Sequence, residues 1–163
     1  MPTKEVEYQV MLVRSDIENT KKLVEDLKPS LVDAAITYMA EMAWKTKKEM
    51  NFYDVKKAYI DNGPFTVCVA FDKQLNVLGF VFLDFEGITK TLWICHAFVK
   101  LEFRKKGVYK LMMKRIKSFA KSIKASRIFS IVYKSNDESQ KAHKKLGFRK
   151  EWTGYEMEIN NEE

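Results

Sequence analysis

The chain is poor in the residues that break or cross-link a fold, with 2 Cys, 3 Pro and 6 Gly among 163 residues. Cys68 and Cys95 stand in apolar, strand-like segments and lack the spacing of a metal site, so we interpret them as reduced core thiols and expect no bound metal. Internal repeats, low-complexity segments and linkers are also missing. Because 46% of the residues are apolar and 13% are aromatic, we expect a folded chain rather than a disordered one.

Long apolar runs are absent as well. No run approaches the roughly 18 residues of a membrane span, and no secretory segment opens the chain, so we expect a soluble cytoplasmic protein. A length of 163 residues fits one domain that buries roughly two-thirds of its unfolded surface. We therefore predict a single domain over residues 1–163, with residues 160–163 as a frayed tail.

Acidic residues are scarce in one part of the chain. Residues 100–150 hold 17 Lys and Arg against 3 Asp and Glu, a net charge of +14, whereas the remainder carries −7, which gives the +7 of the whole. A basic segment of this size favours a nucleic acid or a small polyanionic cofactor as partner, and a solvated helix face without a partner is the alternative. Charge alone leaves these alternatives open.

The first sixty residues show helical periodicity after one short strand. Alternating apolar residues predict this strand over residues 6–12. Asp16 is a plausible N-cap for a short helix that Pro29 closes. Two further helices are predicted over residues 31–48 and 53–60.

From Phe65 onward the period of the apolar residues changes to two. Three apolar segments joined by short polar turns predict an antiparallel meander over residues 65–71, 77–85 and 92–99. A long amphipathic helix and another strand follow closely, which implies a parallel pairing with a right-handed crossover. These two elements, a last helix and a final hairpin are predicted over residues 107–124, 127–133, 136–146 and 148–159. The prediction is an α/β (α+β) fold with a mixed, mostly antiparallel sheet of about seven strands and flanking helices.

The turn Arg104-Lys105-Lys106-Gly107-Val108-Tyr109 joins a strand-like segment to the long helix. Free N–H groups, the positive end of the helix dipole and three cationic side chains converge there, which favours binding of a phosphate or pyrophosphate. Gly107 allows close approach of the backbone. Lys110 adds positive charge from the first helical turn.

Two motifs, in this order, resemble those of the GNAT acetyltransferases. The segment Ala97–Phe103 followed by the turn Arg104–Tyr109 is similar to the family's strand and Arg/Gln-x-x-Gly-x-Gly/Ala motif. Asn136 and the run His143-Lys144-Lys145-Leu146-Gly147-Phe148 are similar to a second signature, an Asn after the next strand and a Tyr-x-x-Leu-Gly-Phe-like run. The order of elements matches the family in outline over the entire chain, and the motif match is specific from about Leu92 to Phe148.

The resemblance implies a GNAT fold in which two strands splay apart at an acyl-CoA site, with acetyl-CoA as co-substrate. The backbone of Phe98 and Val99 would hydrogen-bond the pantetheine arm, and Asn136 would contact the same arm. The pyrophosphate would lie on the turn and the first helical residues, which are Arg104, Lys105, Lys106, Gly107, Val108, Tyr109 and Lys110.

The sequence departs from the family pattern at two positions. Tyr109 stands where members usually carry Gly or Ala, so we expect its side chain to point away from the pyrophosphate. His143 stands where many members carry a Tyr, the general acid that protonates the departing thiolate. Histidine can serve as this acid because its unperturbed pKa of about 6.5 is close to neutral. The alternative is a surface histidine on a lysine-rich helix.

The strand before the turn supplies candidates for the chemistry of the amine. Strand alternation puts Trp93 and Cys95 on one face, which the resemblance implies is the face of the catalytic base, and His96 on the other unless a bulge shifts it. We keep His96 as the candidate base. Cys95 is a candidate nucleophile, with a buried structural thiol as the alternative. The backbone N–H near Val99 is the candidate for polarising the thioester carbonyl.

The residues on the acceptor side are less specific. Asp84, Glu86 and Glu41 could attract a cationic amine, although hairpin solubility and a solvated helix face explain them equally well. An acceptor wall is expected from the helices of residues 31–60 and from the last hairpin, with core packing as the alternative. Its aromatic residues are Trp44, Phe52, Tyr53, Trp152 and Tyr155.

The sequence therefore predicts an N-acetyltransferase that moves an acetyl group from acetyl-CoA to a primary amine by direct attack. The alternatives are a GNAT-fold binding or structural protein without catalysis, which the departures at Tyr109 and His143 favour, and a nucleic-acid-associated module that uses residues 100–150. Aromatic residues are sparse in the basic helix, which argues against the last alternative. The sequence leaves the acceptor, and the question of a homodimer, open.

Overall fold

The computed structural model describes residues 7–49, 56–61 and 63–151. Its centre is a sheet in the order β1-β2-β3-β4-β5, in which the first three pairings are antiparallel and β4 pairs with β5 in parallel. The strands are β1 (Tyr8–Arg14), β2 (Thr66–Asp72), β3 (Val77–Glu86), β4 (Thr91–Val99) and β5 (Arg127–Ser130). The helical segments are α1 (Glu18–Thr46), η1 (Lys57–Asp61), η2 (Leu101–Phe103), α3 (Val108–Ser122) and α4 (Asp137–Lys145).

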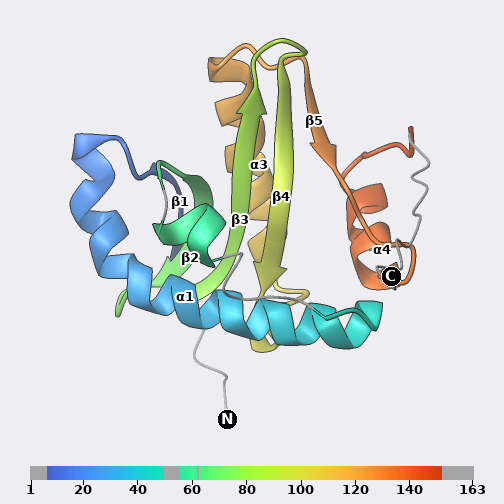
Figure 1. Cartoon of the computed structure of the whole chain (residues 1–163), viewed down its shortest axis with the longest axis horizontal. Helices are drawn as coiled ribbons and strands as arrows, with labels where there is room; N and C mark the ends of the chain where they lie inside the picture. Colours follow the sequence, from blue (N-terminus) through green and yellow to red (C-terminus); the bar gives the residue numbers. More distant parts are fainter. Residues whose placement is uncertain (1–6, 50–55, 62, 152–163) are drawn as a thin grey trace, which may run out of the picture.

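Helices α1 and α3 cover opposite faces of the sheet (Figure 1). Each face has its own core of buried apolar side chains. The α1 core includes Leu31, Phe80 and Phe98, and the α3 core includes Met112 and Ile116. Burial on both faces explains the near-continuous apolar sequence of the central strands. The predicted α/β fold with a mixed, mostly antiparallel sheet and flanking helices is confirmed, as are the meander and the parallel crossover through α3.

The sheet has five strands within the described residues, rather than about seven. β5 ends at Ser130 instead of continuing to residue 133, and residues 148–151 form no strand. The remainder of the predicted final hairpin lies outside the described residues. Of the helix predicted over residues 53–60, only the part from residue 56 is described, and Lys57–Asp61 form a π-helical turn.

Helix α1 runs through Pro29, so the prediction of two separate helices there was wrong. A proline inside a helix removes one hydrogen bond and bends the axis, at a cost of about 3 kcal/mol, and α1 is visibly bent (Figure 1). Leu27 and Leu31, on either side of Pro29, are both buried in the same core. This packing stabilises the helical conformation on both sides of the proline and offsets its cost. Asp16 is not the N-cap, because Ile17 occupies that position and Asp16 forms an ion pair with Arg14 at 2.8 Å.

Candidate functional site

The turn between β4 and α3 forms an open cradle of backbone N–H groups. Lys105 and Gly107 have positive φ angles of 60° and 83°, so the chain turns sharply just before α3 begins. The hydrogen bond from Leu111 N to Gly107 O opens the helix, and the N–H groups of the first turn therefore lack a helical acceptor. A Cβ placed on Gly107 would meet nothing within 4 Å, so the space in front of the turn is open.

Exposed lysines surround this turn. Lys105, Lys106 and Lys110 are all exposed, and Nζ of Lys106 lies 5.8 Å from the ring centre of Phe103. Val108, by contrast, is buried in the α3 core, so it can offer an anion only its backbone N–H. Positive side chains, the helix dipole and free N–H groups thus meet at the N-terminal end of α3, which suits a pyrophosphate.

Arg104 differs from the lysines that follow it, because protein groups engage its guanidinium. Nε donates to Val99 O at 2.8 Å, and the terminal nitrogens form ion pairs with Glu41 of α1 and, at 3.5 Å, with Glu138 of α4. Lys45 joins the same carboxylates, 2.7 Å from Glu41 and 3.1 Å from Glu138. These four charged side chains tie α1, the turn and α4 together.

The cluster determines the charge state of Glu41. Burial alone raises the pKa of this carboxyl, but the hydrogen bonds and charges of Arg104 and Lys45 outweigh burial and hold its pKa below the usual value. Glu41 is therefore ionised and already has two cationic partners. An incoming amine would have to compete with them.

Tyr109 packs inward, between α3 and α4. Its hydroxyl is buried and makes no hydrogen bond with the described residues, and burial raises its pKa to about 12. The ring centre lies 6.2 Å from that of His143. The side chain thus leaves the exposed face of the turn uncovered, but it carries an unpaired buried polar atom, which is rare in folded proteins.

His143 is half-buried, and both of its ring nitrogens are engaged in hydrogen bonds. Its Nδ1 lies 2.8 Å from Ser139 O, and because a carbonyl oxygen only accepts, this nitrogen carries a proton. Its Nε2 lies 3.0 Å from the hydroxyl of Ser130, the last residue of β5, and accepts from it when the ring is neutral. Phe148 packs against the ring, with the centres 4.9 Å apart. His143 is thus an oriented imidazole rather than a free surface side chain.

Asn136 is the N-cap of α4. Its Oδ1 accepts from Ser139 N at 3.2 Å, and its Nδ2 lies 3.7 Å from the sulfur of Met42 on α1. Capping alone explains an asparagine at this position. Because sulfur is a weak acceptor, Nδ2 keeps hydrogen-bonding capacity for a further partner.

Within the described residues, strand β4 has no pairing partner on its β5 side beyond Ile94. The two strands pair only from Thr91 to Ile94 of β4, and they then diverge (Figure 1). The carbonyl of Val99 accepts from Arg104 and therefore points toward this open edge. The N–H and C=O of one strand residue point to the same edge, so the N–H of Val99 lies there too.

The backbone carbonyl of Phe98 points in the opposite direction, toward β3. Its carbonyl oxygen lies against Gly79 of β3, 2.8 Å from where a Cβ on that glycine would stand. Its ring is buried in the α1 core. Of the two residues expected to meet a pantetheine arm, Val99 is the one that offers backbone groups to the open edge.

A β-bulge places His96 on the α1 side of the sheet. His96 pairs with Phe82 and Ile94 pairs with Leu83, so Cys95 is the extra residue of β4. Cys95 packs against the α1 core, and His96 hydrogen-bonds a residue of α1. Simple alternation predicts opposite faces for Cys95 and His96, and the bulge is the physical reason why that prediction fails.

Tyr38 of α1 holds the ring of His96. Its hydroxyl lies 3.0 Å from Nδ1, and Tyr59 of η1 meets the ring edge-on with the centres 5.0 Å apart. Burial lowers the pKa of His96 below its usual value and raises that of Tyr38 to about 12. At neutral pH the site therefore holds a neutral imidazole beside a protonated phenol, and the imidazole can accept a proton.

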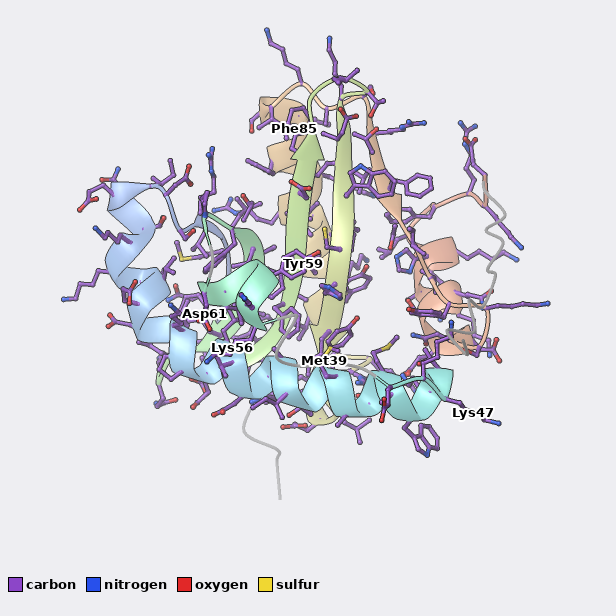
Figure 2. The ribbon with its side chains drawn as sticks, viewed as in Figure 1. Met39, Lys47, Lys56, Tyr59, Asp61 and Phe85 are labelled. Atoms are coloured by element: carbon purple, nitrogen blue, oxygen red, sulfur yellow. The ribbon has the colours of Figure 1, made fainter. Side chains whose placement is uncertain are left out.

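Asp84 and Cys95 both interact with Tyr59, the residue that meets the His96 ring. Tyr59 stands between η1 and the strands β3 and β4 (Figure 2) and hydrogen-bonds Cys95. Asp84 is exposed near the end of β3, and its charge acts on both Tyr59 and Cys95. Burial and, more weakly, Asp84 raise the pKa of Cys95 against the hydrogen bond from Tyr59. The sulfur is thus a thiol at neutral pH, which argues against a nucleophilic role.

Glu86 has a local structural role. It accepts from the N–H groups of Ile88 and Thr89, at 2.7 and 2.8 Å, and from the Thr89 hydroxyl. These hydrogen bonds lower the pKa of Glu86 and close the turn between β3 and β4. Asp84 makes no such hydrogen bond with the described residues, so it is the better placed of the two carboxylates to meet a cation.

Three residues of the site carry no signal in the sequence: Tyr38, Tyr59 and Ser130. Each acts through a partner that is distant in sequence, as with Tyr38 and His96. Trp44, expected in an acceptor wall or the core, is 80% exposed. The other four aromatic residues of that expected wall lie outside the described residues.

Within residues 7–49, 56–61 and 63–151, no three His, Cys, Asp or Glu side chains come together as a metal site would require. In the same part of the chain no helix has the length and apolar content needed to cross a bilayer.

Comparisons with known proteins agree with this geometry. Residues 28–148 match the model of the Acetyltransferase (GNAT) family, whereas no curated protein matches the chain. Three solved structures with a similar fold illustrate the structural likeness. The first is a ribosomal-protein-alanine N-acetyltransferase from Brucella melitensis biovar Abortus 2308, with a TM-score of 0.66 and 14% identity over 94% of this chain and 100% of that chain. The second is the aminoglycoside N-acetyltransferase AAC(6')-Iy in complex with CoA, with a TM-score of 0.62 and 14% identity over 97% of this chain and 98% of that chain. The third is a GNAT-family acetyltransferase from Staphylococcus aureus Mu50, with a TM-score of 0.62 and 13% identity over 86% of this chain and 85% of that chain.

At these identities the solved structures show a shared fold and leave the substrate of this chain undetermined. The family match is more specific, because it spans both sequence motifs, the open edge of β4 and the start of α3. The chain therefore belongs to the GNAT family of acetyltransferases.

Proposed function

We propose that the protein is an N-acetyltransferase that moves the acetyl group of acetyl-CoA to a primary amine by direct attack. The observation that carries this proposal is the proximity of two backbone features, the open edge of β4 at Val99 and the free N–H groups that begin α3. The first suits an extended arm that contains amides, and the second suits a pyrophosphate. Acetyl-CoA contains both groups. The aminoglycoside N-acetyltransferase of similar fold was solved with CoA, which supports the same co-substrate here.

The residues assigned to acetyl-CoA divide into those that bind it and those that position the turn. Val99 and the Nδ2 of Asn136 would bind the pantetheine arm. Arg104 and Phe98 would position the turn and the strand, since their polar groups face protein. The pyrophosphate would be held by backbone N–H groups and positive charge of Lys105, Lys106, Gly107, Val108, Tyr109 and Lys110.

The acyl transfer needs a neutral amine, a polarised carbonyl and a proton for the leaving sulfur. The amine nitrogen bonds to the acetyl carbon, and the C–S bond breaks with its electron pair on sulfur. His96 would take the proton that the amine loses, because burial keeps its imidazole neutral. The N–H of Val99 would stabilise the negative charge that develops on the carbonyl oxygen.

His143 would supply the proton for the sulfur. Its Nε2 contacts the Ser130 hydroxyl at the point where β5 leaves β4. In its protonated form the ring would donate to Ser130, whose own proton would pass to the thiolate. This arrangement gives the histidine a defined route toward the diverging strands in place of the tyrosine that many family members carry.

The acceptor would be a cationic amine. Asp84 is an exposed carboxylate close to Cys95 and Tyr59, and Tyr59 in turn contacts His96. A protonated amine held by Asp84 against the Tyr59 ring would be next to its base. We also assign the protein to the cytoplasm, since both cysteines are free and acetyl-CoA is an intracellular metabolite.

A thermal-shift titration tests the co-substrate, with acetyl-CoA, CoA and ATP as ligands. Acetyl-CoA and CoA should raise the melting temperature by several degrees, whereas ATP at the same concentration should raise it less. Equal shifts for all three would refute acyl-CoA binding. Release of free CoA with a panel of primary amines then tests catalysis.

A GNAT-fold protein without catalysis is the second candidate. The hydroxyl of Tyr109, which is buried without a hydrogen bond among the described residues, and the hydrogen bonds that engage both ring nitrogens of His143 favour it. Such a protein would bind CoA weakly or not at all, and no amine would release CoA from acetyl-CoA.

A further inference from the structure

Helix α3 carries a row of lysines along its solvent face. Lys110, Lys114, Lys117 and Lys121 are all exposed. They recur at intervals of four, three and four residues, which places them on one side of the helix. At 1.5 Å per residue this lysine row is about 16 Å long.

No acidic residue compensates the lysine row. Helix α3 contains no Asp or Glu, and no described carboxylate forms an ion pair with any of its lysines. Several lysines of α1 do form ion pairs, as Lys28 does with Asp61 and Lys45 with Glu41. The lysine row thus carries four of the 17 basic residues of residues 100–150 on a surface where no described carboxylate neutralises them.

The row works against the stability of its own helix. Like charges at i and i+4 destabilise a helix, whereas a Glu four residues before each Lys would stabilise it. A face that only had to be solvated would gain from such acids. Their absence favours a polyanionic partner for this face.

The rest of α3 excludes several kinds of polyanion. Tyr109 and Phe119 are turned into the α3 core, so the helix offers no ring on which the bases of a single strand could stack. Its apolar face, with Met112 and Ile116, is also buried and cannot enter a membrane. Leu111 is the one large apolar side chain of α3 that is exposed, whereas protein interfaces depend on aromatic and apolar anchors and are depleted in lysine.

A duplex remains as the matching partner. Double-stranded nucleic acid presents about one negative charge per 1.7 Å of axis. A row of point charges can follow its phosphates without reading the bases. We propose that the lysine row of α3 binds the phosphate backbone of a nucleic-acid duplex without base specificity.

The place of the row is compatible with the acetyltransferase site. Helix α3 covers the face of the sheet opposite α1 and His96 (Figure 1), so a bound duplex leaves the acceptor face open. Only Lys110 belongs both to the row and to the residues assigned to acetyl-CoA. Lys114, Lys117 and Lys121 can therefore be changed without touching that site.

The test uses the full chain and a fluorescent duplex of about 20 base pairs, prepared as DNA and as RNA. Binding is followed by anisotropy at several NaCl concentrations from about 25 to 200 mM. The variant is Lys114→Gln/Lys117→Gln/Lys121→Gln. The matched control, Lys21→Gln/Lys22→Gln/Lys47→Gln, removes the same charge from exposed positions of α1 and its C-terminal end. A single cooperative melting transition in each variant shows that both are folded.

For the wild type, log Kobs should fall with log salt with a slope near −3.6, or about −0.9 for each of four phosphate contacts. The α3 variant lacks three of the four lysines, so its slope should be shallower by about 2.7. The control variant should keep the slope of the wild type. Binding to the DNA duplex, to the RNA duplex or to both supports the proposal and identifies which kind of nucleic acid the protein binds.

Equal slopes for the two variants, or no duplex binding at about 25 mM NaCl, would overturn the proposal. Binding of poly-glutamate or phosphatidylserine vesicles without binding of duplex would also overturn it, and would identify an acidic protein or a membrane as the partner. Complete displacement of the duplex by saturating CoA would overturn it as well, because the lysines would then serve the co-substrate.

Discussion

The hydroxyl of Tyr38 lies 3.0 Å from Nδ1 of His96, although the two residues are 58 positions apart. The contact joins the middle of α1 to the bulge in β4, and it holds the imidazole on the α1 side of the sheet. Because burial lowers the pKa of His96, the ring is neutral at neutral pH. This pair is the basis for assigning the proton acceptor of the reaction.

Replacement of His96 by Gln should lower kcat by about 10²- to 10⁴-fold, since the amide keeps the size of the ring but cannot take a proton. In the wild type, kcat/KM should fall at low pH as His96 becomes protonated. The usual pKa of a histidine is 6.5, and burial lowers the pKa of His96 below this value. The decrease of kcat/KM at low pH should therefore lie below pH 6.5. The pH profile of kcat/KM with an active amine measures it.

Tyr38→Phe is the matched change, because it keeps the ring and removes only the hydroxyl. In Tyr38→Phe, kcat/KM should still fall at low pH, but at a different pH from the wild type. The loss of kcat should be smaller than in His96→Gln. A decrease of kcat/KM at low pH that is the same in His96→Gln as in the wild type would exclude His96 as the base.

Gly107→Ala should weaken binding of CoA and destabilise the protein. The φ of 83° strains any residue with a Cβ, at a cost of about 1–2 kcal/mol, and the new methyl group would enter the space in front of the free N–H groups. Gly147→Ala is the control, because Gly147 has a φ of 86° and equally open surroundings but lies at the end of α4.

Both glycine variants should lose stability by similar amounts, a few degrees in melting temperature. Only Gly107→Ala should also reduce the thermal shift that CoA produces. Equal CoA shifts in the two variants would show that the turn does not hold the co-substrate.

The local features of the site could be predicted from the sequence. The basic turn, its glycine and the helix that follows are adjacent in the chain, and the structure has a sharp turn with positive φ directly before α3. The capping role of Asn136 is local too, and its contact with the pantetheine arm, which the family resemblance implies, stays a prediction. Short-range rules of helix ends suffice for such features.

The non-local features could not be predicted in this way. The bulge at Cys95 depends on how β4 pairs with β3, so alternation along one strand gave the wrong face for His96. The continuity of α1 through Pro29 depends on packing of Leu27 and Leu31 against the sheet, which local propensity does not include. The roles of Tyr38 and Ser130 could not be predicted for the same reason, because each depends on a contact with a histidine that forms only in the folded chain.

Tyr109→Phe should stabilise the free protein, by up to about 1 kcal/mol. The Tyr109 hydroxyl is buried without a hydrogen bond among the described residues, and removing such a group removes its desolvation cost. The melting temperature should therefore rise by about 2–4 °C at most. A lower melting temperature would mean that the hydroxyl has a partner in solution. A smaller CoA-induced shift in the variant would identify acyl-CoA as that partner.

His143→Ala should lower kcat by about 10²-fold or more and leave the affinity for CoA nearly unchanged, because the ring would act on the leaving sulfur and not on binding. Ser130→Ala keeps the ring and removes the hydroxyl that Nε2 contacts at 3.0 Å. If Ser130 passes the proton, this second variant should lose a similar factor, and the double variant should lose little more than either alone.

Single-turnover rates and CoA titrations of the three variants distinguish this scheme from a structural role. The loss of packing against Phe148 in His143→Ala would lower stability and CoA affinity together, whereas loss of a proton donor lowers only the rate of acyl transfer. An unchanged rate in His143→Ala would remove the histidine from the chemistry. A full rate in Ser130→Ala with a slow His143→Ala would mean that the imidazole reaches the sulfur without the serine.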